Sequence, residues 1–220
     1  MGEPLYISSY CVISETAISK NGQLVYHGVN PKDPADFFQA AYKELAFNYP
    51  KFYKMDNLCK LGWLAAEVLV HVKTGNNISS FAEENYDPVS VSVLLGNSSS
   101  SLDTDLKYYQ TVDQMASPAL FVYTLPNIVI GEICIRNGWK GENAFFIAEN
   151  FQSRMFEEQV QMMMSDINNQ ACVCGWVEIF GTDYKACLFA VEKKNNGQNI
   201  LFSERNIEMI FNTPQGAFVE

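Results

Sequence analysis

The sequence predicts a layered α/β domain in which helices pack against a mixed sheet. Short runs rich in Val, Ile and Tyr alternate with segments whose apolar residues recur at helical spacing. Near the end of the chain, residues 171–180 and 184–192 are β-rich runs joined by Gly181-Thr182-Asp183, which predicts an antiparallel hairpin. No repeat or linker divides the 220 residues, so we expect one domain over residues 1–220.

The remaining strands are expected in the first two thirds of the chain. Residues 5–13 are rich in Ile, Val and Tyr, and the Asn21-Gly22 turn signal leads into a short strand at residues 23–27. The apolar-rich run at residues 89–95 is typical of a central buried strand. Residues 144–148 predict a short strand after it.

Helices are expected where apolar residues repeat every three to four positions. The longest covers residues 55–73, with a stripe from Leu58 to Val72. Residues 117–125 are expected to be extended, and residues 76–88 to form a polar loop. The serine run 98–101 predicts a turn with an N-cap before Asp103. Further helices are expected at residues 35–47, from about 103, at 126–137, 154–168 and 204–211.

Composition excludes several kinds of partner. The net charge of −10 disfavours nucleic acid and anionic membrane surfaces, both of which select for surplus Lys and Arg. No run of about 18 apolar residues and no secretory signal is present, so we expect a cytoplasmic protein that does not span a membrane.

The cysteines and histidines do not indicate a metal site. Six cysteines lie inside apolar segments, as buried free thiols do, and Cys172 and Cys174 would share one strand face. His27 and His71 are interpreted as a surface residue and a packed helix residue. Motifs for nucleotide phosphates or a nucleophile elbow are absent from the sequence, so we expect no metal and no cofactor.

Four segments between residues 54 and 150, in order, resemble the N-terminal half of β-ketoacyl-carrier-protein synthases (ketosynthases) of the thiolase superfamily. The most specific is residues 117–127, SPALFVYTLPN. The others are residues 54–56 (KMD), residues 94–105 (LLG followed by SLDTD) and residues 138–142 (GWKGE). This resemblance implies a thiolase-like half with a mixed, mostly parallel five-stranded sheet flanked by helices.

The resemblance also identifies the position of the catalytic nucleophile. In active members a cysteine follows the second glycine of the turn by nine residues, at a helix start whose partial positive charge favours the thiolate. Counting from Gly141 leads to Asn150, a vestigial position with Glu149 and Ser153 as neighbours. A carboxamide is not a usable nucleophile, although asparagine is a good helix N-cap. The family's two catalytic histidines belong to a second half, and neither His27 nor His71 corresponds to them.

Other roles follow from the same resemblance. Family members dimerise by pairing the strand before the nucleophile, so the interface candidates are Asn143, Ala144, Phe145, Phe146, Ile147 and Ala148. The alternative for this strand is a covered position in the core. Substrate-tunnel candidates after the vestigial site are Phe151, Met155 and Phe156, for which core packing is the alternative.

The leading hypothesis is a non-catalytic ketosynthase-like subunit, similar to chain-length factors. It would pair with an active ketosynthase, or with itself, in fatty-acid, polyketide or aryl-polyene synthesis. Acyl carrier proteins are acidic as a family, so a protein at −10 would contact them only indirectly. The alternatives are a 3-oxoacyl-carrier-protein synthase type acyltransferase with Ser153 or Cys134 as nucleophile, and a stand-alone acyl-chain binding module.

Overall fold

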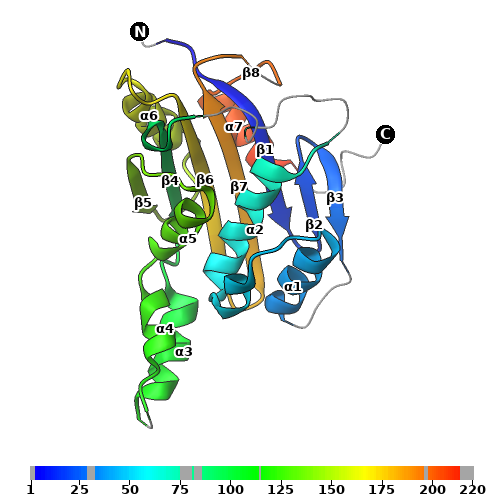
Figure 1. Ribbon diagram of the computed structural model, residues 1–220, viewed down its shortest axis with the longest axis vertical. Helices are drawn as coiled ribbons and strands as arrows, with labels where there is room; N and C mark the ends of the chain where they lie inside the picture. The colour runs from blue at the N-terminus through cyan, green and yellow to red at the C-terminus, as the bar shows by residue number, and fades with distance from the viewer. Residues whose placement is uncertain are drawn as a thin grey trace.

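The computed structural model describes residues 3–28, 33–74, 81, 86–113, 115–195 and 198–213. Its centre is one mixed sheet with strand order β3-β2-β1-β7-β6-β4-β5, in which the short strand β8 also pairs with β1 (Figure 1). The strands are β1 Tyr6–Ser14, β2 Ala17–Lys20, β3 Gln23–His27, β4 Val91–Asn97, β5 Asn143–Ile147, β6 Ala171–Phe180, β7 Asp183–Glu192 and β8 Ile200–Leu201.

The predicted class, an α/β domain with a mixed sheet, is confirmed, but the details of the sheet differ. It has eight described strands rather than five, and only β5 and β6 run parallel to their common neighbour β4. The other described pairings are antiparallel. Strands β1, β2 and β3 form a meander, and β6 and β7 form the predicted hairpin. Strand β7 also pairs with β1 and so connects the hairpin to the meander.

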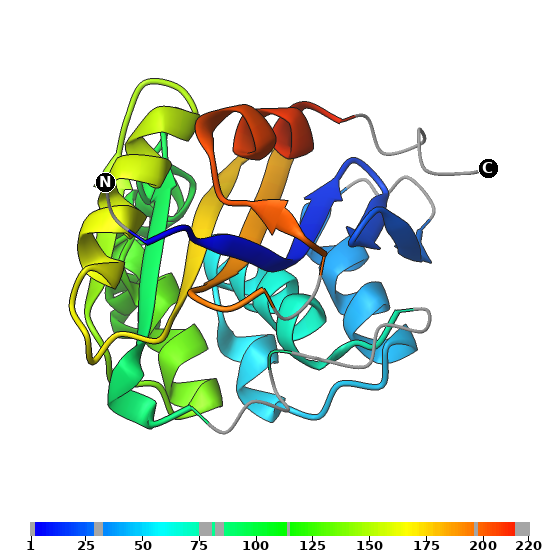
Figure 2. The same cartoon turned by 90° about the horizontal axis from the view of Figure 1, so that it is seen from above.

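Helices cover both faces of this sheet. The first layer contains α1, α2 and α5, which pack with one face of the strands into a core that includes Trp63 and Leu64. The second layer contains α6 and α7, which pack on the opposite face around Phe156 and Phe189 (Figure 2). The helical segments are α1 Pro34–Glu44, η1 Pro50–Lys54, α2 Asn57–His71, η2 Pro88–Ser90, α3 Leu102–Val112, α4 Pro118–Phe121, η3 Val122–Thr124, α5 Ile128–Asn137, α6 Ser153–Met164 and α7 Glu204–Asn212.

Segment 117–125 is helical rather than extended, so that prediction was wrong. The Ser117 hydroxyl accepts a hydrogen bond from the Leu120 backbone N–H at 3.3 Å, and Pro118 occupies the first turn. Both are start signals for a helix, here α4, which continues into the 3-10 turn η3. The following helix α5 begins at Ile128, two residues beyond the expected Pro126. Most of the expected polar loop at 76–88 lies outside the described residues.

Among the described strands, β5 forms one end of the sheet and pairs only with β4. The turn before it approaches β4 so closely that a Cβ atom on Gly141 would lie 2.2 Å from the Val91 carbonyl oxygen. Backbone hydrogen bonds on both sides of Gly141 fix this approach, from Lys140 N–H to the Pro88 carbonyl (2.7 Å) and from Val93 N–H to the Glu142 carbonyl (2.9 Å). The small glycine therefore sets the position of β5.

Candidate functional site

The segment that leaves β5 leads to the expected nucleophile position. The ladder with β4 ends where the Ala148 N–H donates to the Asn97 carbonyl at 3.1 Å. Glu149 and Asn150 then form an exposed bend before α6 begins at Ser153. The strand–bend–helix arrangement that the sequence indicated is therefore present at Asn150.

Asn150 is not the N-cap of the helix, contrary to the expectation. The N-cap is Gln152, whose side chain makes no capping hydrogen bond to the first turn. The chain takes two further residues, Phe151 and Gln152, to turn from the bend into α6. Asn150 therefore precedes the N-cap by two residues and does not itself occupy the positive end of the helix dipole.

A pocket of about 340 Å³ lies beside this bend. Four residues indicated by the sequence line it together, namely Glu149, Asn150, Phe151 and Ser153. Residues from β6 and α7, and the serine after β4, complete the lining: Ser98, Trp176, Glu178, Glu208, Phe211 and Asn212. The structure thus gathers residues far apart in the chain around Asn150.

Among the residues that the structure describes, the pocket lining contains carboxylates and hydroxyls but neither cysteine nor histidine. Glu178 is occupied as a hydrogen-bond acceptor, since its carboxylate binds the Ser98 backbone N–H (2.5 Å) and hydroxyl (2.6 Å) and the hydroxyl of Ser99. Ser153 is only 8% exposed. With carboxylates from Glu149, Glu178 and Glu208 around it, the pocket opposes the formation of any further negative charge, including a thiolate or an alkoxide.

Aromatic rings fill the space next to the bend. The rings of Phe151 and Phe211 stack with centroids 3.8 Å apart and an interplanar angle of 10°. Phe151 also contacts Phe156 (5.4 Å) and Trp176 (5.8 Å). The Lys185 ammonium lies 3.8 Å from the centroid of the Phe211 ring and donates to the Phe211 carbonyl at 2.6 Å. Helix α7 therefore packs its last turn directly onto the candidate site.

The tunnel candidates occupy different environments. Phe151 lines the pocket, while Phe156 is buried in the core beneath it and Met155 packs against that core without lining the pocket. Burial of Phe156 matches the core-packing alternative for that residue.

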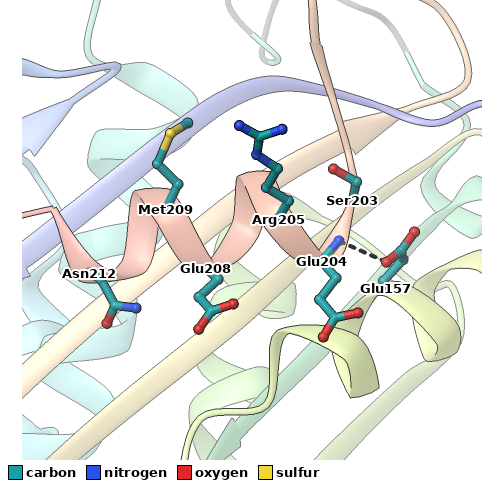
Figure 3. A pocket seen from close by; sticks show the side chains of 7 residues that line it. All are labelled: Glu157, Ser203, Glu204, Arg205, Glu208, Met209 and Asn212. Atoms are coloured by element: carbon teal, nitrogen blue, oxygen red, sulfur yellow. Dashed lines mark hydrogen bonds between the residues drawn. The ribbon is translucent and has the colours of Figure 1, made fainter.

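A second, more open pocket of about 570 Å³ lies between α6 and α7, and Figure 3 shows its lining. The Glu157 carboxylate accepts a hydrogen bond from the Glu204 backbone N–H at 2.7 Å and so caps the start of α7. The lining residues are Glu157, Ser203, Glu204, Arg205, Glu208, Met209 and Asn212. Because Glu208 borders both pockets, this face carries a continuous group of carboxylates.

The interface candidates lie on the edge strand or directly after it. Residues 143 and 147 are exposed, residues 144–146 are half-buried, and Ala148 follows at the end of the ladder. Phe145 packs towards the first core and Phe146 towards the second, so adjacent side chains point to opposite faces. This edge placement differs from the covered-strand alternative.

The remaining candidates lie away from the pocket. Cys134 is in α5, and burial raises the pKa of its thiol to about 11. His27 contacts Thr16 at the far end of the sheet, and His71 lies 3.2 Å from the Asn137 amide oxygen at the end of α2. Among the described residues, no group of three His, Cys, Asp or Glu side chains has the arrangement of a metal site.

Sequence patterns did not indicate the residues that β6 and α7 contribute to the pocket. Glu178 interrupts an otherwise apolar strand, which is the one local signal that could have marked it. Trp176 in β6 and Glu208 and Phe211 in α7 carry no such signal, because only tertiary packing brings these two elements to the pocket.

By sequence, no protein-family model and no curated protein matches this chain. Solved structures match its fold. The ishigamide ketosynthase/chain length factor superimposes with a TM-score of 0.62 at 15% identity, over 90% of this chain and 64% of the other. The ketosynthase ApeO in complex with its chain length factor ApeC, from Xenorhabdus doucetiae, gives 0.54 at 11% identity over 87% and 79%.

A third match is AntDE:AntF, a type II PKS acyl-carrier protein in complex with its ketosynthase bound to the hexaketide. It gives a TM-score of 0.57 at 12% identity, over 89% of this chain and 65% of the other. The described architecture is therefore a thiolase-like α/β fold. More particularly, it is the fold seen in ketosynthases and chain length factors. The superposition covers much more of this chain than residues 54–150. This chain spans less than two thirds of the length of two of the matched chains.

Proposed function

We propose that this protein is a non-catalytic ketosynthase-like subunit that pairs with an active ketosynthase in fatty-acid, polyketide or aryl-polyene synthesis. The observation that carries the proposal is the pocket beside α6. Asn150, which the resemblance places at the position of the nucleophile, lines this pocket, and its described lining residues include no cysteine and no histidine. A Claisen-type condensation by acyl transfer needs an activated nucleophile and a group that moves protons.

The edge strand supports the pairing. In a parallel pair, alternate residues of a strand bond to the neighbour, and the bonds of Glu142 and Ala148 to β4 fix which ones do so. The backbone groups of Asn143, Phe145 and Ile147 therefore point away from β4, where a strand of another subunit could bond to them. Two of the structural relatives are a ketosynthase with a chain length factor.

Electrostatics supports a division of labour between the two subunits. Glu149 and Glu208 line the pocket beside Asn150, and the neighbouring pocket adds Glu157 and Glu204 against the one cation Arg205 among its described lining residues. An acidic carrier protein would be repelled there, so the acyl chain would be delivered to the active site of the partner. The role of this chain would be to complete the partner's acyl cavity, with Phe151 the nearest candidate to contact a chain.

The test is co-expression with the ketosynthase encoded nearest to this protein in its genome, followed by native mass spectrometry. A one-to-one complex is expected. Ile147→Pro removes an outward-facing N–H at a 58% exposed position without removing a bond to β4, and should abolish the complex. Ile147→Thr keeps that N–H and is the matched control. If the wild-type proteins stay separate, the proposal fails, and a bound lipid on the single chain would favour an acyl-binding module instead.

One observation favours the rival acyltransferase. Ser153 is buried, lines the pocket and is the first residue of α6, so its hydroxyl lies near the positive end of a helix dipole. Incubation with radiolabelled acyl-carrier protein distinguishes the two functions. The subunit proposal predicts no stable label. Covalent labelling that disappears in Ser153→Ala would contradict it.

A further inference from the structure

The segment between β4 and α5 exposes an unusual amount of apolar surface. In α3, the large apolar residues Leu102, Leu106 and Tyr109 recur at helical spacing, and all three are exposed. Thr104 is the only residue of this helix that is buried. An amphipathic helix normally turns its apolar stripe to the core, but the stripe of α3 faces solvent.

The exposed surface continues beyond α3. We define the helical hairpin as α3, α4 and η3 together with the residues described between and just after them. Tyr109 is 73% exposed. The other exposed large apolar side chains of the hairpin are Leu102, Leu106, Val112, Met115, Phe121, Val122 and Leu125. Single exposed apolar residues are ordinary, but a group of this size marks an interaction surface.

The hairpin lies on the same side of the molecule as the edge strand. It follows β4 directly in the chain, and α3 and α4 project beyond the sheet at the end formed by β4 and β5 (Figure 1). A subunit that approached β5 from the side would therefore also meet the hairpin.

We propose that the hairpin is the main apolar contact with the same ketosynthase partner that pairs with β5, an inference that rests on the proposed function. A stable pair buries about 800 Å² on each partner, far more than a five-residue edge strand presents. The eight exposed hairpin side chains could supply on the order of 600 Å², given that a buried aromatic side chain contributes about 150–250 Å². The strand fixes the register, and the hairpin supplies the area.

Polar contacts at its base hold the hairpin in place. The Thr104 hydroxyl donates to the Asp56 carboxylate at 2.5 Å, and that carboxylate also caps α2 by accepting from the Cys59 N–H at 2.9 Å. The Ser101 hydroxyl donates to the Thr124 carbonyl at 2.8 Å and so joins the two ends of the hairpin. A surface that is already ordered loses less conformational entropy when it binds.

Charge favours a protein partner other than a second copy. The hairpin carries Asp103, Asp105 and Asp113 against the single cation Lys107, which disfavours anionic lipid headgroups. Two copies of a chain at −10 would repel each other, whereas a less acidic subunit would not.

Two leucine substitutions test the proposal in the co-expressed complex. Leu106→Glu places a carboxylate on the hairpin at a 48% exposed position, and should raise the dissociation constant at least about tenfold. Leu24→Glu makes the same change on β3, the opposite edge of the sheet, at a 54% exposed position, and should leave it unchanged. Circular dichroism of each free variant checks that the substitution leaves the fold intact.

The outcomes separate this inference from the proposed function. If Ile147→Pro abolishes the complex while both Leu106→Glu and Tyr109→Glu bind as tightly as wild type, the hairpin inference is wrong and the subunit proposal stands. If the wild-type proteins do not pair, both are wrong. Two other results would overturn the inference, because each would assign the hairpin to another occupant. One is a homodimer of the wild type that Leu106→Glu disrupts. The other is flotation of the wild type with phosphatidylcholine–phosphatidylglycerol vesicles that is lost in the same variant.

Discussion

Replacing Gly141 with alanine should detach the edge strand that leads to the candidate site and forms the proposed pairing surface. The added Cβ would lie 2.2 Å from the Val91 carbonyl oxygen and 3.0 Å from that of Val89. Both atoms belong to the backbone, so the conflict can be relieved only if the turn before β5 moves by about an ångström. That movement would weaken the hydrogen bonds that join Lys140 to Pro88 and Val93 to Glu142.

The expected loss of stability follows from the steric clash and from the weakened hydrogen bonds. Overpacking of this kind costs about 1–3 kcal/mol, and two backbone hydrogen bonds contribute about 1 kcal/mol each. Since a partial shift relieves some of the clash while losing part of the bonds, we expect a loss of about 2–4 kcal/mol in the free energy of unfolding. Urea denaturation measures it, and pairing with the ketosynthase should weaken in parallel.

Gly131 provides the matched control. It lies within α5, and apart from its chain neighbours and the backbone of its own helix no described heavy atom lies within 4 Å of the place where its Cβ would be. Gly131→Ala should therefore stabilise the protein by about 0.5–1 kcal/mol, because alanine favours helix. If Gly141→Ala is as harmless as Gly131→Ala, the reasoning about the position of β5 is wrong.

Three further predictions concern buried polar groups. Arg136→Met should lower the free energy of unfolding by about 2–4 kcal/mol, because it removes the guanidinium group that binds the buried Glu67 carboxylate at 2.9 and 3.0 Å. Chemical denaturation measures this loss, and a value below about 1 kcal/mol would contradict the prediction. Burial raises the pKa of Cys187 to about 12, so Ellman's reagent at pH 8 should label this thiol only after unfolding. Burial lowers the pKa of Lys20 from 10.5 to about 8. Between these two pH values the unfolded state binds more protons than the folded state. The free energy of unfolding of the wild type should therefore increase by up to about 3 kcal/mol as the pH rises from about 8 to 10.5. The stability difference between Lys20→Met and wild type should shrink over the same range, and a constant difference would refute the assignment.

Local patterns predicted the long elements well. The stripe from Leu58 to Val72 located α2, and two β-rich runs around Gly181 located β6 and β7 almost to the residue. The four-residue strand β2 was missed, because Ala17–Lys20 is too short to show a period. The direction of the pairings was also beyond local reasoning, since the contact of β1 with β7 joins segments more than 170 residues apart.

The candidate site was predicted only in part, for a related reason. Counting from Gly141 placed Asn150 at the bend, which depends on the length of one strand. The exact start of α6 depends on how Phe151 packs against Phe211 and Trp176, and these partners come from β6 and α7. The pocket is therefore a product of tertiary packing. A linear motif can predict only those lining residues that belong to the motif itself.

The position of β5 at the end of the sheet has a consequence for the size of the assembly. A strand that already bonds to β4 has one row of free backbone groups left. Once a neighbouring strand has taken that row around a two-fold axis, a third molecule finds no donors or acceptors at this edge. Growth through β5 is therefore self-limiting, and any larger particle must use a different part of the surface.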